Sequence, residues 1–484
     1  MLFTEPTFLF LFLPILLGLY FIRGSREHAA YGNWLLLAAS VIFYTRGAGS
    51  FTWLVLALIG FNYAAARLID RHRATVLGRR LLASAIAIDL LVLAVFKYAD
   101  FAVGNLNVAL ALAGAQPFAL PGILLPIGIS FFTFHAISYV VDVYRRDAAA
   151  QKRPVEAALY LLVFPQLVAG PIVRYRQIAE QLSVRVTSMG DFAYGIRRFV
   201  IGLSKKMLIA NTLAAPADQI FAMPAAEMSA VYAWTGVVCY TLQIYFDFSG
   251  YSDMAIGLGR MFGFRFPENF NYPYIAASIQ DFWRRWHMSL SAWFRDYVYI
   301  PLGGNRTSTG RMYFNLVLVF FLCGLWHGAR WTFVVWGLYH GVFLVLERVG
   351  LAALIGALPK PLRHAYALLV VMVGWVIFRA DTLGGVVAML AAMAGAGATS
   401  APVFAPAWFW NTEVLLAVGA GIVGSTPVLT ALGQRLAVPA ESAGVRVLRW
   451  QASMAAVMGL MALLAASLML SASRSYNPFI YFRF

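Results

Sequence analysis

Charge is scarce in this sequence. Only 12% of its 484 residues are Asp, Glu, Lys or Arg, whereas 61% are hydrophobic. Soluble domains carry about 25% charged residues, and a soluble chain could not cover so much apolar surface with polar groups. The composition therefore excludes an ordinary soluble domain and indicates a chain whose solvent is the lipid bilayer.

Cysteine is scarce, and several catalytic motifs are missing. The two cysteines, Cys239 and Cys323, lie inside apolar runs, so they indicate neither a disulfide framework nor a metal site. We expect each to be a small core residue. The sequence has no His-Glu-x-x-His zinc motif, no P-loop and no Gly-x-Ser-x-Gly elbow. These absences argue against a zinc protease, a nucleotide hydrolase and a serine hydrolase.

The charge that is present is mostly positive, with a net value of +16. Lys and Arg form small clusters between apolar runs, for example around residues 71–80 and 145–153. This pattern is typical of cytoplasmic loops, and such loops contact anionic lipid head groups. Because the charges are dispersed between runs, we expect no nucleic-acid partner.

Apolar runs follow one another along the chain. At about 20 residues per crossing, there is room for about 11–12 membrane segments, some of them re-entrant. We therefore predict an all-α polytopic transmembrane bundle that forms one domain over residues 1–484. The run from Pro6 to Ile22 lacks the features of a cleaved signal peptide, and Arg23 and Arg26 place its far end inside. Residues 425–450 are expected to be an exposed loop before the last span.

One segment carries too much charge for a membrane span. It runs from Gln280 to Arg306 and reads QDFWRRWHMSLSAWFRDYVYIPLGGNR. Its residues favour a helix that ends at Pro301 and the following glycines. Two interpretations stay open. The segment is either an interfacial helix with tryptophans at head-group level, or a helix that dips toward a polar cavity and presents His287.

Helical spacing arranges the side chains of this segment. Arg284, His287 and Ser291 would share one face, and Asp281 would pair with Arg285 four residues later. An adjoining apolar face would contain Trp283, Trp286, Leu290 and Trp293.

A second histidine ends a strongly apolar run, in the sequence Trp326-His327-Gly328. Ionisable residues inside spans are costly and mark functional sites by default; the alternative for His327 is a neutral histidine satisfied by one backbone carbonyl. His340 has the small-xxx-small surroundings of helix packing. On one continuous helix it would stand about 20 Å from His327, so we interpret it as a packing residue unless the chain breaks at Gly328. His135 would either line a cavity or pack in the core, and we favour core packing.

Two carboxylates, Asp247 and Asp253, lie deep in the apolar sequence TLQIYFDFSGYSDMAIGLG. They suggest either a cation pathway or ion pairs with nearby basic residues, which buried charges usually need. We favour ion pairs. The remaining chemistry is one or two intramembrane histidines without an obvious covalent nucleophile. It suits direct acyl transfer, in which a histidine deprotonates an incoming hydroxyl.

Long motifs along most of the chain resemble the membrane-bound O-acyltransferase (MBOAT) family, and within it the bacterial alginate O-acetylation branch. They are LLPIGISFFTFHAISYVVDVYR, FPQLVAGPIVRY, YFDFSGYSDMAIGLG, FRFPENFNYPY, the 280–306 segment, LWHGARWTFVVWGLYHG and the ending NPFIYFRF.

The resemblance implies a helical bundle around a central tunnel in the bacterial inner membrane. It implies acetyl transfer from cytoplasmic acetyl-CoA, which is a substrate rather than a cofactor, toward an extracytoplasmic polysaccharide such as alginate, cellulose or peptidoglycan, with periplasmic acetyltransferase partner proteins. The family's histidines match His327, as general base or transient acetyl carrier, and His287, which would orient the donor or the acceptor. Arg284 and Arg285 would either meet the acidic coenzyme or anchor the helix. Trp326, Ser291 and Asp281 are the other candidates for binding a substrate or lining the tunnel.

Two other functions remain open. A transporter or channel would use Asp247 and Asp253 as ion ligands in a pore. A non-catalytic scaffold would recruit periplasmic enzymes and tolerate substitution of both His287 and His327.

Overall fold

The computed structural model describes residues 1–22, 29–119, 122–397, 400, 404–436, 443–473 and 476, and none of these residues forms a strand. This confirms the all-α prediction.

The first part of the chain forms η1 (Phe8–Phe12), α1 (Leu13–Ile22), α2 (Ala29–Ala48), α3 (Phe51–His72), α4 (Val76–Leu112), α5 (Ile129–Arg145), α6 (Pro154–Leu162), α7 (Phe164–Leu167) and α8 (Tyr175–Ser183). The middle part forms α9 (Met189–Ser204), η2 (Lys205–Ala210), α10 (Asn211–Phe221), η3 (Ala225–Glu227), α11 (Ala230–Met261), η4 (Pro273–Ile275), α12 (Ile279–Arg285), α13 (Met288–Phe294) and η5 (Arg295–Tyr299). The last part forms α14 (Thr309–His327), α15 (Trp331–Leu346), η6 (Glu347–Leu351), α16 (Ala352–Gly356), α17 (Lys360–Arg379), α18 (Leu383–Met393), η7 (Pro406–Phe409), α19 (Thr412–Gly424), α20 (Val428–Leu436) and α21 (Ala443–Ser473).

Several of these helices suit a membrane. In the described part of the chain, six stretches are long and apolar enough to cross one: α3, α4, α14, the stretch from α15 through α16, α17 and residues 453–473 of α21. The bent pair of α19 and α20, with 58° between its halves, would make a seventh, and shorter apolar helices lie at Phe8–Ile22 and Leu383–Met393. Large apolar side chains such as Trp53, which is 76% exposed, cover the outside. The chain is therefore a multi-pass membrane protein.

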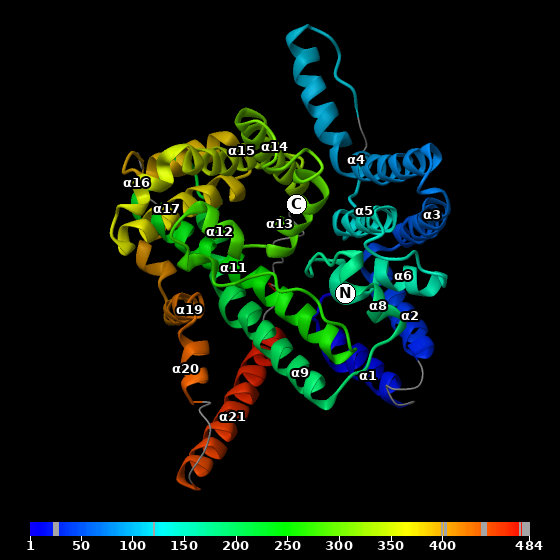
Figure 1. Cartoon of the computed structure of the whole chain (residues 1–484). Helices are drawn as coiled ribbons and strands as arrows, with labels where there is room; N and C mark the ends of the chain where they lie inside the picture. The colour runs from blue at the N-terminus through cyan, green and yellow to red at the C-terminus, as the bar shows by residue number, and fades with distance from the viewer. Residues whose placement is uncertain are drawn as a thin grey trace.

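The centre of the molecule is α11, which packs against α9 and α10 and has few exposed side chains. The end of α4 and the red helix α21 project from this body (Figure 1). Residues 425–450, expected to be a loop, include α20 and the start of α21, while 437–442 lie outside the described residues. Arg23 and Arg26, which oriented the first span, also lie outside them.

The helices α14 and α15 form an antiparallel hairpin that breaks at Gly328. A Cβ on Gly324 would lie 2.3 Å from the carbonyl oxygen of Phe333, and one on Gly337 would lie 2.3 Å from that of Phe320. The two backbones can approach this closely only because neither glycine has a side chain. The chain thus takes the alternative named above, a break at Gly328, and α15 folds back along α14 (Figure 1) instead of carrying His340 away from His327.

The single helix predicted for the 280–306 segment is wrong at its centre. Helix α12 ends at Arg285, and His287 then adopts a left-handed conformation (φ 45°, ψ 53°) before α13 begins at Met288. A residue outside the 280–306 segment stabilises this turn: Met288 donates its backbone N–H to the carbonyl of Asn269. A tertiary contact of this kind is not visible in local helix propensity.

Candidate functional site

Trp326 separates the two histidines that the sequence singled out. Its ring centroid lies 4.8 Å from that of His327 and 6.2 Å from that of His287. Both histidines are buried, with 7% and 1% of their surface exposed. Residues 40 positions apart in the sequence thus lie around one indole ring, in a buried cluster of aromatic and imidazole rings that we call the chamber.

Aromatic rings form the walls of this chamber. The imidazole of His327 contacts Trp336 and Phe378 edge-on, at centroid distances of 5.0 and 5.1 Å. The imidazole of His287 contacts Phe248 at 4.6 Å. Walls of this kind exclude water and strengthen any polar interaction made inside them.

One asparagine orients His287. The Nδ1 atom of His287 lies 2.9 Å from Oδ1 of Asn269, which also accepts a hydrogen bond from the Ser289 hydroxyl. The Asn269 amide nitrogen donates in turn to Ser252. Because Oδ1 can only accept, Nδ1 of His287 carries the proton and Nε2 carries the lone pair.

The Nε2 atom of His287 lies at the other end of this network. It is buried and has no hydrogen-bond partner among the described residues. Burial also lowers the pKa of His287 to about 3, so the imidazole is neutral. A neutral, fixed imidazole with an open lone pair can accept a hydrogen bond from a hydroxyl or amide that enters the chamber.

The other histidines pack in the interior. His135 is fully buried, and its Nε2 accepts the backbone N–H of Val173, which confirms the core interpretation. His340 contacts Trp336 and Trp283 with centroid distances of 5.2 and 5.1 Å. His340 therefore supports Trp336, which is a wall of the chamber, and the sequence pattern gave no sign of this contact.

A cavity of about 220 Å³ lies beside the chamber. Its apolar wall includes Trp283 and Cys323, and Cys323 stands one helical turn before His327. Arg284 and Ser291 also line it. Two further arginines, Arg295 and Arg348, also line the cavity.

Arg285 and Asp281 do not line this cavity. The Nε atom of Arg285 lies 2.9 Å from Oδ1 of Asp281, which confirms the pair expected from the spacing. Arg285 also donates to the carbonyl of Asn271, and it does not line the cavity that Arg284 lines. The two neighbouring arginines therefore have different surroundings: Arg285 braces α12, and Arg284 lines the cavity.

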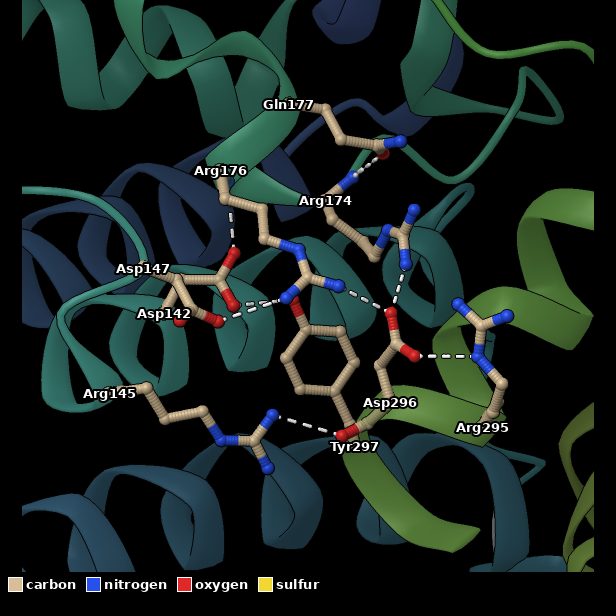
Figure 2. Close-up of polar contacts among 9 residues, drawn as sticks. All are labelled: Asp142, Arg145, Asp147, Arg174, Arg176, Gln177, Arg295, Asp296 and Tyr297. Atoms are coloured by element: carbon tan, nitrogen blue, oxygen red, sulfur yellow. Dashed lines mark hydrogen bonds and ion pairs between the residues drawn. The ribbon is translucent and has the colours of Figure 1, made fainter. Parts of the chain in front are cut away.

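A group of ion pairs anchors the end of the segment (Figure 2). The carboxylate of Asp296 is paired with Arg174, with Arg176 at 2.5 Å and with Arg295 at 2.8 Å. Burial opposes its ionisation, but the three arginines outweigh burial and hold the pKa of Asp296 below its usual 3.8. Arg295 belongs both to this cluster and to the wall of the cavity.

The same cluster joins three elements. Asp142 at the end of α5 accepts hydrogen bonds from the Tyr297 hydroxyl, at 2.6 Å, and from the backbone N–H of Arg176 on α8. Arg145 donates to the carbonyl of Asp296. Figure 2 shows the Tyr297 ring in the middle of these contacts. Helices α5 and α8 thereby hold η5, and with it one wall of the cavity, in place.

The two carboxylates of α11, Asp247 and Asp253, form ion pairs with basic side chains, which is the alternative favoured from the sequence. Asp247 lies 2.5 Å from Lys206, and Asp253 lies 2.7 Å from both Arg198 and Lys205. The described residues contain no group of three or more His, Cys, Asp or Glu side chains suited to a metal ion. Both carboxylates therefore have structural partners, which weakens the transporter interpretation.

A second cavity, of about 620 Å³, is lined by Asn269 and Met288, which are the hydrogen-bond partner and the sequence neighbour of His287. Polar side chains line it, among them Ser249, Ser252 and Asn269. The Asn269 that orients His287 is thus also part of the wall of this cavity. Nothing in local sequence periodicity pointed to Asn269, because its partner lies 18 residues away and beyond α12.

Comparison with known proteins identifies the family of the chain. Residues 118–383 match the family model of the membrane-bound O-acyltransferase (MBOAT) family. The chain is 43% identical to the probable alginate O-acetylase AlgI of Azotobacter vinelandii over the full length of both proteins. It is 49% identical to the Pseudomonas aeruginosa protein of the same name, over 79% of this chain and 73% of the relative. It is also 36% identical to the peptidoglycan O-acetyltransferase of Helicobacter pylori, over 83% of this chain and 81% of that protein.

Proposed function

Because the chain belongs to the membrane-bound O-acyltransferase family, and is therefore an acyltransferase, we propose that it transfers acetyl groups from acetyl-CoA toward an extracytoplasmic polysaccharide. The observation that carries this proposal is the chamber in which Trp326 separates His287 from His327. The relatives named above are acetylases of alginate and of peptidoglycan. Alginate is the first candidate acceptor, and peptidoglycan or cellulose are the alternatives.

The donor binds in the cavity of about 220 Å³. Acetyl-CoA combines an apolar thioester end with an acidic nucleotide end. The cavity offers apolar side chains near His327 and the guanidinium groups of Arg284, Arg295 and Arg348. Guanidinium groups suit phosphate oxygens because they can donate two parallel hydrogen bonds. This match of chemistry supports acetyl-CoA as the donor substrate.

The transfer itself needs one base and one oriented reactant. His327 accepts the proton of the acceptor hydroxyl while the hydroxyl oxygen attacks the thioester carbonyl. The carbon–sulfur bond then breaks, the acetyl ester forms, and the coenzyme leaves as a thiolate that recovers the proton from His327. His287, held by Asn269, orients the donor or the acceptor through Nε2.

The enclosed position of the site bears on where the acetyl group goes. A site inside the bundle lets a donor and an acceptor meet without either crossing the bilayer. In this proposal the protein lies in the bacterial inner membrane, and periplasmic acetyltransferase proteins are its partners in delivering the acetyl group.

The test is acetyl transfer by the purified protein in detergent, with labelled acetyl-CoA and oligosaccharides of alginate, cellulose or peptidoglycan. Wild type is compared with His327→Ala and with His72→Ala, a histidine at the end of α3. The proposal expects release of free coenzyme by wild type and His72→Ala but not by His327→Ala. Turnover by a folded His327→Ala protein equal to that of wild type would contradict the proposal and favour a non-catalytic scaffold.

A further inference from the structure

The helix that carries His327 ends inside the bundle, where its last backbone carbonyls need partners. A helix leaves its final carbonyl groups without intrahelical donors, and an unsatisfied carbonyl is especially costly away from water. In α14 the backbone N–H of Gly328 reaches only the carbonyl of Gly324, at 3.3 Å. The carbonyls of Leu325, Trp326 and His327 are left to be satisfied from elsewhere.

Two adjacent side chains of α4 satisfy them. The Tyr98 hydroxyl donates to the carbonyl of Leu325 at 2.7 Å. The ammonium of Lys97 donates to the carbonyl of Trp326 and lies 3.4 Å from that of His327. The cap is therefore supplied by a helix more than 220 positions earlier in the sequence.

Lys97 is committed to this position. Its third contact is the hydroxyl of Ser130 on α5, at 3.3 Å, so three oxygens receive the three hydrogens of the ammonium. It makes no ion pair with a carboxylate among the described residues. A lysine charge held in a span without a carboxylate partner is costly, and such residues mark function by default.

The same ammonium also contacts the chamber. It lies 5.8 Å from the centroid of the Trp326 ring, within range of a cation–π interaction. Cations are favoured at the C-terminal end of a helix, where the backbone dipoles leave partial negative charge. One group thus fixes the backbone of both Trp326 and His327 and the ring that separates the two histidines.

We propose that Lys97 is a positioning residue for acetyl transfer, which holds the end of α14 so that His327 and Trp326 keep their places in the chamber. This inference rests on the proposed function of His327. Lys97 does not need to touch either substrate. A displacement of about 1 Å in a catalytic group costs about 100-fold in rate, so loss of the cap acts on kcat.

The test compares purified Lys97→Met, Lys97→Arg and Tyr98→Phe proteins with wild type and with His327→Ala. Lys97→Met removes charge and donors at similar length, whereas Lys97→Arg keeps both. We expect kcat to fall about 100-fold in Lys97→Met, with the KM for acetyl-CoA unchanged, and to recover substantially in Lys97→Arg. Tyr98→Phe, which leaves the ammonium in place, should lose much less.

The following results would contradict the positioning role of Lys97. Wild-type kcat in Lys97→Met, or equal losses of kcat and thermal stability in Lys97→Met and Lys97→Arg, would leave Lys97 without a positioning role. If Lys97→Met does not fold, Lys97→Gln replaces it, and equal kcat in Lys97→Gln and Lys97→Arg is then the contradicting result. Turnover by His327→Ala would instead refute the proposed function, so the two failures are distinguishable.

Discussion

At the scale of single residues, Asn269 decides which nitrogen of His287 is open to a substrate. Its Oδ1 atom accepts from both Nδ1 of His287 and the Ser289 hydroxyl, and its amide nitrogen is committed to Ser252. The side chain can therefore not rotate without losing three hydrogen bonds. This hydrogen-bond network, rather than solvent, determines which nitrogen of His287 carries the proton.

Replacing Asn269 by alanine should impair catalysis more than binding. Without the acceptor at Nδ1, the imidazole can turn and present the wrong nitrogen, and supporting contacts of this kind are worth about 10- to 100-fold. We expect kcat to fall within that range while the KM for acetyl-CoA stays constant. Ser252→Ala, which removes only the far end of the network, is the control, and a wild-type kcat in Asn269→Ala would contradict the role.

Arg284 and Arg285 provide a matched pair for the donor site. Arg284 lines the 220 Å³ cavity, whereas Arg285 is committed to Asp281. Loss of one phosphate contact of about 1.4 kcal/mol corresponds to a tenfold change in affinity. Steady-state kinetics should therefore give a KM for acetyl-CoA about tenfold higher in Arg284→Ala and unchanged in Arg285→Ala. The same KM in both variants would place the nucleotide elsewhere.

At the scale of elements, the close contact of α14 with α15 places His327. Gly324→Ala would put a methyl group 2.3 Å from the Phe333 carbonyl, whereas a Cβ on Gly310 of the same helix meets nothing within 4 Å. Overpacking of this kind costs about 1–3 kcal/mol. Thermal unfolding in detergent should show a lower midpoint for Gly324→Ala only, and a Gly324→Ala protein as stable as wild type would show that the hairpin can open without cost.

The ion pairs around η5 make a prediction about pH. The three arginines hold the folded pKa of Asp296 below its usual 3.8. Its ionised carboxylate therefore stabilises the fold at pH values above 3.8, and this stabilisation is lost as the pH falls through the lower folded pKa.

The measurement compares the stability of wild type with that of Asp296→Asn from pH 7 to pH 3. Removing one partner of a buried ion pair costs about 3 kcal/mol. The difference in free energy of unfolding should stay constant down to about pH 5 and shrink below the usual carboxylate pKa. A difference that grows toward acidic pH would contradict the role of Asp296.

At the scale of the whole molecule, composition and apolar runs were enough to predict a multi-pass helical protein. Helical spacing also predicted the pair of Asp281 with Arg285. It placed Arg284, His287 and Ser291 on one helical face, but the helix breaks at His287, and of the three only Arg284 and Ser291 line the 220 Å³ cavity. These features depend on contacts within one turn or on the burial of apolar surface, and both leave a periodic trace in the sequence.

The rest of the site depends on contacts that have no such trace. The turn at His287 needs Asn269, and the end of α14 needs Lys97 and Tyr98 from α4. His340 joins the surroundings of His327 only because the chain reverses at Gly328. Tertiary contacts override local propensity at these three points, and all three lie at the chamber.

The most direct test of the chamber is a single-turnover measurement with labelled acetyl-CoA on wild type, His287→Ala and His327→Ala, with donor binding measured separately on the same samples. The account predicts that all three proteins bind acetyl-CoA with similar affinity and that only wild type releases coenzyme at its full rate. Full-rate release by either folded histidine variant would contradict the claim that the two histidines beside Trp326 carry out the transfer.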